Sequence, residues 1–169
     1  MCNSKVSIGL TNPKSTTNVG AVFRAAGCFQ AQSILYTGTR YDRAAPFCTD
    51  TQNLNKSIPL TKVECLIESA PEGAQIVVIE LVENAQSLPD FQHPDNAFYI
   101  FGPEDGSVPK NIVKKADSVV YIPTKGCLNL AATVNVVLYD RLAKSSQREE
   151  GNELIRQSRD ANNRMKLKR

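Results

Sequence analysis

Three segments of the sequence place charged or amide side chains among glycine, proline and apolar residues, a mixture that suits a site better than a plain core. The first runs from Asn18 to Arg24 and otherwise contains only glycine and apolar residues. An arginine in such a stretch is not typical of a solvated helix face, and the competing interpretation is an ordinary ion pair. Because a guanidinium group stays protonated up to about pH 12, it is poorly suited to act as a base and acts as a cation instead.

The spacing within this first segment limits how its two polar ends can cooperate. Six residues correspond to about 600° around a helix, so Asn18 and Arg24 lie on faces about 120° apart. They can border one pocket only near the beginning of the helix, where Asn18 is also expected to be the cap.

The second segment, residues 101–107, follows an apolar run and contains glycine, proline and two acidic residues. Gly102 allows the backbone to approach a ligand, the proline fixes the turn, and Glu104 then projects from a rigid loop. The third segment, residues 122–130, ends a strand, turns through a glycine-containing loop and opens a long helix at Asn129. Asn129 is expected to cap that helix whether or not it also takes part in chemistry.

Several familiar chemistries are disfavoured by what the sequence lacks. Its one histidine, His93, precedes a proline in a stretch expected to be a surface loop, which argues against a histidine base. Neither a G-x-G-x-x-G motif nor a Walker A loop is present. The five cysteines include no C-x-x-C pair, which argues against a disulfide framework or a zinc site and predicts reduced thiols in a cytoplasmic protein. Cys127 has no base partner that would make it a nucleophile.

The elements that must position these residues alternate between strands and helices. Strands are expected at residues 6–10, 33–36, 76–81, 97–101 and 118–122. Helices are expected at residues 18–31, 61–69, 107–116 and 129–144, with a long loop over residues 37–59. This alternation predicts an α/β fold with a mostly parallel sheet flanked by helices. All three segments then lie where strands end or helices begin, at the edge where open α/β sheets bind ligands.

The length of 169 residues predicts a single domain, and no apolar run approaches the roughly 20 residues that a membrane-spanning helix needs. The net charge of +3 hides an uneven distribution. Residues 144–169 carry eight basic and four acidic groups, whereas residues 1–143 carry one more acidic than basic group. Residues 147–169 are therefore expected to be a basic, helical tail that is either simply solvated or bound to an anionic partner.

Taken in order, the three segments resemble the motifs of the SpoU branch of the SPOUT superfamily, whose members are RNA 2′-O-ribose methyltransferases. The matching stretches are residues 18–24, residues 101–104, and residues 122–123 with 128–130 and the helix to Tyr139. The resemblance covers roughly residues 5–144. Two departures are visible: Ser107 stands where family members commonly have glycine, with Gly106 before it, and Cys127 stands where serine is frequent.

The resemblance implies a methyltransferase domain over residues 1–146, followed by the tail, with a deep trefoil knot at about residues 97–144. It also implies a homodimer formed through the knot region, with the active site at the interface, and S-adenosylmethionine as the methyl donor. No metal is implied. Three loops would hold the cofactor through backbone groups of Leu81, Val82, Glu83, Phe101, Gly102, Pro103, Gly106, Ile122 and Leu128.

By the same resemblance, Arg24 acts on the ribose 2′-hydroxyl, assisted by Asn18, Glu104 and Asn129. The substrate is then RNA, with transfer RNA favoured over ribosomal RNA, and the basic tail has a partner in RNA phosphates. Two alternatives stay open. One is a non-catalytic RNA-binding or assembly protein on the same fold, and the other is an unrelated α/β nucleotide-binding enzyme.

Overall fold

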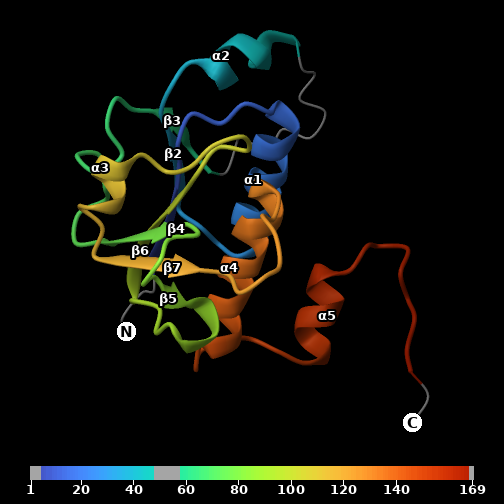
Figure 1. Ribbon diagram of the computed structural model, residues 1–169. Coiled ribbons are helices and arrows are strands. Elements are labelled where there is room, and N and C mark those ends of the chain that lie inside the picture. Colours follow the sequence, from blue (N-terminus) through green and yellow to red (C-terminus); the bar gives the residue numbers. More distant parts are fainter. Residues whose placement is uncertain (1–4, 48–57, 168–169) are drawn as a thin grey trace.

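The computed structural model describes residues 5–47 and 58–167, and Figure 1 shows how their elements are arranged. The strands are β1 (Lys5–Leu10), β2 (Ser33–Tyr36), β3 (Leu60–Lys62), β4 (Gln75–Ile79), β5 (Gln86–Ser87), β6 (Asn96–Phe101) and β7 (Ser118–Tyr121). The helices are α1 (Thr16–Cys28), α2 (Arg40–Ala44), α3 (Lys110–Val113), α4 (Leu130–Lys144) and α5 (Asn152–Ser158), with short 3-10 helices η1 (Ala45–Phe47) and η3 (Leu88–Asp90). None of these helices combines the length and the apolar character needed to cross a membrane.

The strands of the described residues form one sheet in the order β3-β2-β1-β6-β4-β7-β5. Every neighbouring pair is parallel, so all of the strands end at the same edge. β6 occupies the centre between β1 and β4, with Phe101 opposite Leu10 on one side and Ile79 on the other. The predicted α/β fold with a mostly parallel sheet is confirmed, and its trefoil knot stays a prediction.

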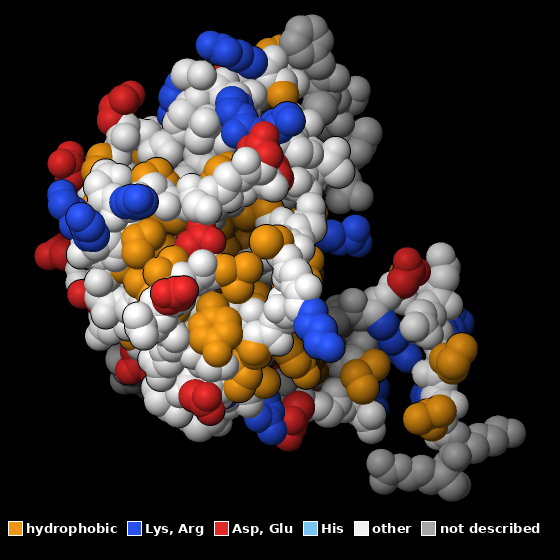
Figure 2. Space-filling view, in the orientation of Figure 1, with side chains coloured by type: hydrophobic (Ala, Val, Ile, Leu, Met, Phe, Trp, Pro, Cys, Tyr) orange, Lys and Arg blue, Asp and Glu red, His pale blue; other side chains and the backbone are white. Residues whose placement is uncertain are grey.

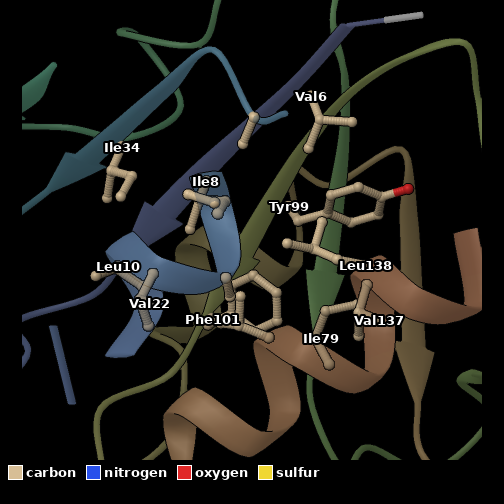
Figure 3. Packing of buried hydrophobic residues seen from close by; sticks show 14 of the residues in the cluster. Val6, Ile8, Leu10, Val22, Ile34, Ile79, Tyr99, Phe101, Val137 and Leu138 are labelled. Carbon is tan, nitrogen blue, oxygen red and sulfur yellow. The ribbon is translucent and has the colours of Figure 1, made fainter. Parts of the chain in front are cut away.

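Helices cover both faces of the sheet, with α1 and α4 on one face and α3 on the other (Figure 1). The strand sequences are apolar on both faces for this reason. Along β6, Tyr99 and Phe101 pack toward α1 and α4 (Figure 3). The alternate residues, Phe98 and Ile100, pack on the opposite face in a cluster that includes Ile112 of α3. The period of two residues thus places the central strand in both cores at once.

The two long helices begin at polar caps. Ser15 is extended, and its hydroxyl accepts a hydrogen bond from the Asn18 backbone N–H at 3.2 Å, so it caps α1. The prediction of a cap at Asn18 is therefore wrong, because a hydroxyl three residues earlier already satisfies the first turn. Asn129 caps α4 as predicted, since its side-chain oxygen accepts from the backbone N–H groups of Ala131 and Ala132 at 2.9 and 3.3 Å.

Other expected elements also change. Residues 61–69 form no helix, because β3 covers residues 60–62 and turns follow it. A helix was expected here because Thr61 and Glu64 have the spacing of a capping box. Parallel pairing of β3 with β2, with Leu60 opposite Ile34, outweighs that local signal. Helix α3 is only four residues long and begins after Pro109. Within the loop expected over residues 37–59, α2 and η1 supply local structure, and residues 48–57 lie outside the described residues.

His93 is not a surface loop residue, and that prediction is wrong. Its side chain is only 5% exposed, with Nδ1 2.6 Å from the Tyr99 hydroxyl and Nε2 2.8 Å from the Asp140 carboxylate. Because a carboxylate can only accept, Nε2 donates to Asp140 and Nδ1 accepts from Tyr99. Burial lowers the pKa of His93, and it raises the pKa of Tyr99 to about 12, so both are neutral near pH 7. The histidine thus links α4 to β6 and to the segment before it.

The end of the chain lies apart from the body. Helix α5 has no buried residue, and Figure 1 shows it standing beside α4 rather than packed on the sheet. The residues around it are exposed, as a solvated or partner-dependent segment should be. The division into a domain over residues 1–146 and a tail over 147–169 stays a prediction.

Candidate active site

The loops that leave β1, β4, β6 and β7 meet at one edge of the sheet, because these strands are parallel. Three of these loops, those after β4, β6 and β7, form a cavity of about 320 Å³ together with the start of α4. On the face shown in Figure 2, hydrophobic and acidic side chains lie together where the surface is hollowed. The cavity lies within the size range of small-molecule sites and occupies the edge at which such sheets bind ligands.

Most residues assigned to the cofactor by resemblance line this cavity. They are Leu81, Phe101, Gly102, Pro103, Gly106, Ile122 and Leu128. Val82 and Glu83 are exposed and lie outside the lining, one and two residues beyond Leu81. Sequence reasoning missed Glu80, Thr124 and Thr133, which also line it. The position of Glu80 directly after β4 was the available signal, since residues that follow parallel strands reach the ligand edge.

Gly102 has a steric reason for being glycine. A Cβ atom at this position would lie 3.3 Å from the Val108 backbone nitrogen and 3.4 Å from a Glu80 carboxylate oxygen. The backbone of the loop after β6 therefore lies directly against its neighbours at the cavity wall. Gly106 lines the same cavity. Although the glycine stands one position earlier than in the family pattern, with Ser107 after it, this loop still has a small residue at the cavity wall.

Glu104 joins the loop after β6 to the beginning of α1. Its carboxylate accepts hydrogen bonds from the backbone N–H groups of Lys14 and Ser15, each at 2.9 Å, and from the Asn18 side-chain amide at 3.0 Å. Partial burial raises the pKa of Glu104, but the hydrogen bonds from Asn18, Ser15 and Lys14 outweigh it and leave the pKa below its usual value. Glu104 is thus an ionised acceptor and anchor, not a group suited to carry a proton in a reaction near pH 7.

Asn18 forms the centre of a chain of side-chain amides. Its oxygen accepts a hydrogen bond from the Asn129 amide nitrogen at 3.0 Å, while its own amide nitrogen donates to Glu104. The orientation of both amides follows from their partners, because the Asn129 oxygen is already committed to the N-terminus of α4 and Glu104 can only accept. The structure therefore brings three of the four predicted catalytic residues together from segments 86 and 111 residues apart.

Arg24 is the fourth predicted catalytic residue, and it is not part of this chain. It lies about 9 Å further along α1 than Asn18, on the exposed side of the helix, and does not line the cavity. No described carboxylate forms an ion pair with it, which disfavours the competing interpretation of a simple surface pair.

A second contact closes the cavity wall next to Glu104. Arg40, at the start of α2, donates to both oxygens of Asp105 at 2.8 and 3.0 Å, and the Lys14 ammonium lies 3.6 Å away. The Arg40 guanidinium lowers the pKa of Asp105. The sequence held no sign of this pair, because α2 was expected to be loop.

Potential metal ligands and cysteines were located in the part of the chain that the structure describes. It contains no group of histidine, cysteine, aspartate and glutamate side chains that could hold a metal ion. Its cysteines, Cys28, Cys65 and Cys127, are free thiols. Cys127 lines the cavity, and no hydrogen bond joins its thiol to a described base.

Solved structures with the same architecture were found by comparison. A TrmH/SpoU tRNA modifying enzyme from A. aeolicus is 20% identical with a TM-score of 0.69, over 83% of this chain and 76% of that one. The SpoU methyltransferase AviRb from Streptomyces viridochromogenes, in complex with AdoMet, is 18% identical with a TM-score of 0.64, over 82% of this chain and 60% of that one. A structure described as giving insight into 2-OH methylation of C/U34 on tRNA is 21% identical with a TM-score of 0.64, over 82% of this chain and 95% of that one.

These similarities establish a common fold at identities too low to transfer an activity. No curated protein sequence matches the chain significantly. A family model does match, over residues 5–139, which contain every residue of the amide chain and of the cavity lining. The chain belongs to the SpoU rRNA Methylase family.

Proposed function

We propose that this protein transfers the methyl group of S-adenosylmethionine to a ribose 2′-hydroxyl of RNA, with transfer RNA as the favoured substrate. The observation that carries the proposal is the chain from Asn129 through Asn18 to Glu104, placed at the rim of a ligand-sized cavity. The preference for transfer RNA draws on two solved relatives described with that substrate, one of which is matched over 95% of its length.

The cavity suits S-adenosylmethionine. Gly102, Pro103 and Ile122 offer backbone and apolar surface, and even a Cβ atom at position 102 would lie tightly against the neighbouring loops. The lining contains no lysine or arginine among the described residues, as expected for a ligand that is itself positively charged. When bound, the cofactor supplies an electrophilic methyl group on a sulfonium sulfur.

The residues around the cavity position the reactants and stabilise charge. As the bond from the 2′-oxygen to the methyl carbon forms and the sulfur–methyl bond breaks, the hydroxyl proton passes to solvent water. Glu104 and Asn129 fix the Asn18 amide between them, which holds the N-termini of α1 and α4 together. Arg24, a permanent cation, binds the phosphate next to the reactive ribose and stabilises negative charge that develops on the 2′-oxygen. Holding that oxygen in line with the methyl carbon accounts for much of the remaining rate.

The position of Arg24 fits a homodimer. Val136, Tyr139 and Leu142 of α4 expose apolar surface, Tyr139 to 63%, beside a hollow lined mostly by apolar residues such as Phe29 and Pro123. A second copy that covers this face would remove the apolar surface from water. Because α1 packs on α4, the exposed Arg24 would then lie at the interface and complete the cavity of the partner.

The tail is proposed to contact RNA phosphates. Arg156, Arg159, Arg164 and Lys166 lie around one shallow hollow formed by α5 and the residues after it. A group of basic side chains on a segment without a buried face suits the sequence-independent part of RNA binding.

The test is a methylation assay with mass spectrometry. RNA is isolated from cells that lack this protein, separated into transfer and ribosomal fractions, and incubated with purified protein and labelled S-adenosylmethionine. Digestion to nucleosides then identifies the product. We expect a 2′-O-methyl nucleoside in the transfer RNA fraction. Methylation of a base contradicts the proposed acceptor, and cofactor binding without any transfer supports the alternative of a non-catalytic RNA-binding protein.

A further inference from the structure

Glu80 connects two of the loops that form the cavity, although no motif assigned it a role. It is the first residue after β4, and its side chain reaches the loop that follows β6. One carboxylate oxygen accepts a hydrogen bond from the Leu81 backbone N–H at 2.9 Å, and the other accepts from the Val108 backbone N–H at 2.8 Å. These bonds hold the carboxylate at the cavity wall, where it lies against Gly102.

The charges that line the cavity are all negative among the described residues. They belong to Glu80, Glu104 and Asp105. Asp105 is paired with Arg40, so its charge is largely compensated. Glu104 faces the N-terminal end of α1, where backbone N–H groups and the positive end of the helix dipole compensate it. Glu80 forms no ion pair with any described residue, so it contributes the least compensated charge.

We propose that Glu80 makes this cavity prefer a positively charged ligand and thereby distinguishes the methyl donor from its spent product. The inference rests on the proposed function. S-adenosylmethionine carries one net positive charge, and the thioether left after methyl transfer carries none. A carboxylate held at the cavity wall favours the positively charged donor over the neutral product. A single charge next to the ligand, partly screened by solvent, changes the affinity on the order of tenfold. The product then competes poorly with fresh donor for the same cavity.

The experiment is calorimetric binding of three ligands to the purified full-length protein and to Glu80→Gln. The ligands are S-adenosylmethionine, S-adenosylhomocysteine, and sinefungin, which carries an ammonium group in place of the sulfonium. We expect Glu80→Gln to weaken binding of the two cationic ligands on the order of tenfold relative to S-adenosylhomocysteine. An equal loss for all three ligands, or no loss, would overturn the inference, because Glu80 would then only hold the loops together.

Two further variants separate charge from shape. Glu80→Asp keeps the charge but is too short to keep both loop contacts, so it should preserve the preference for cationic ligands while weakening all three. Glu68→Gln removes an exposed carboxylate outside the cavity lining and should leave the preference unchanged. Loss of the preference in either variant contradicts the role of the Glu80 charge.

A measurement on the unmodified protein does not depend on any variant folding. Raising the salt concentration should reduce the preference for cationic ligands, because screening weakens a partly exposed charge. A preference that is independent of salt argues against Glu80. If the unmodified protein binds neither S-adenosylmethionine nor its product, the proposed function itself is refuted. Binding of both, with a preference that Glu80→Gln leaves intact, refutes only this inference.

Discussion

Replacing Glu104 with glutamine tests whether this carboxylate holds the site together. One of its oxygens accepts from Ser15 and Asn18, and the other accepts from Lys14. A glutamine oxygen can keep the first pair of bonds, but its NH₂ group then faces the Lys14 N–H, which has lost its acceptor. Hydrogen bonds to charged groups contribute about 1.5–3 kcal/mol each, but the bond from Lys14 is exposed, so water can replace the lost acceptor. Glu104→Gln should therefore lower the free energy of unfolding by about 1 kcal/mol at pH 7.

The assay is urea unfolding followed by circular dichroism, with Asp105→Asn as the matched control. That variant makes the same chemical change one residue away, at an ion pair with Arg40 that is half exposed. Surface pairs of this kind contribute little, so Asp105→Asn should leave the unfolding midpoint unchanged within error. Equal effects of the two variants would refute the assignment of Glu104 as the anchor of this loop.

The pH dependence makes the same test sharper. The pKa of Glu104 is lowered in the folded protein, so the stability that it contributes is present above the ordinary value of 4.5 and is lost as the pH falls through the folded value. A protonated glutamic acid resembles glutamine in shape and charge. The difference in stability between Glu104→Gln and the unmodified protein should therefore shrink below pH 4.5. A difference that stays constant from pH 7 to pH 4 would show that charge is not its cause.

Three further predictions concern activity and RNA binding. Arg24→Ala should reduce methyl transfer by about 100-fold or more and leave the dissociation constant for S-adenosylmethionine nearly unchanged in calorimetry. An equal loss of methyl transfer and of cofactor affinity would show that Arg24 does not act on the RNA. The Arg24→Ala and Asn129→Ala proteins, each inactive alone, should recover about a quarter of the activity when mixed if the arginine acts across the dimer. Half of the dimers are then mixed, and each mixed dimer holds one intact site out of two. No recovery would place Arg24 and Asn129 in the site of one protomer. Deleting residues 147–169 should reduce the slope of log affinity against log salt by about 3, since the four basic groups around the hollow of the tail are lost with it. An unchanged slope means that the tail is only solvated.

Local patterns in the sequence predicted the parts of the fold that local forces decide. The helix that begins after Asn129 and the strand at Ile76–Ile79 were found because capping and apolar runs are properties of a few neighbouring residues. The helix expected at residues 61–69 failed because pairing with β2, a distant contact, gave those residues a different partner. His93 failed for the same reason, since its burial depends on Tyr99 and on Asp140, 47 residues away.

The site was predictable in outline because parallel strands end at one edge. That rule alone brings the loops after β1, β6 and β7 together, and with them Asn18, Glu104 and Asn129. It could not indicate the order of the amide chain, which depends on Ser15 taking over the capping role at α1 and leaving the Asn18 side chain free. It also could not indicate Arg40, because its contact with Asp105 depends on α2, which was expected to be loop, and on the conformation of the loop after β6.

The distribution of charge at this edge explains how one small protein can hold two ligands of opposite sign. The cavity wall is negative, with Glu80 as its least compensated group. Three cations lie outside the cavity: Lys14 in the loop before α1, Arg24 on α1 and Arg40 on α2. A cationic methyl donor and an anionic RNA backbone would then occupy adjacent regions of matching potential, each repelled from the other's place. After methyl transfer the donor loses its positive charge while the RNA keeps its phosphates. Only the cavity side of the site then loses its attraction, so the spent cofactor should dissociate more readily from the complex than the fresh donor does.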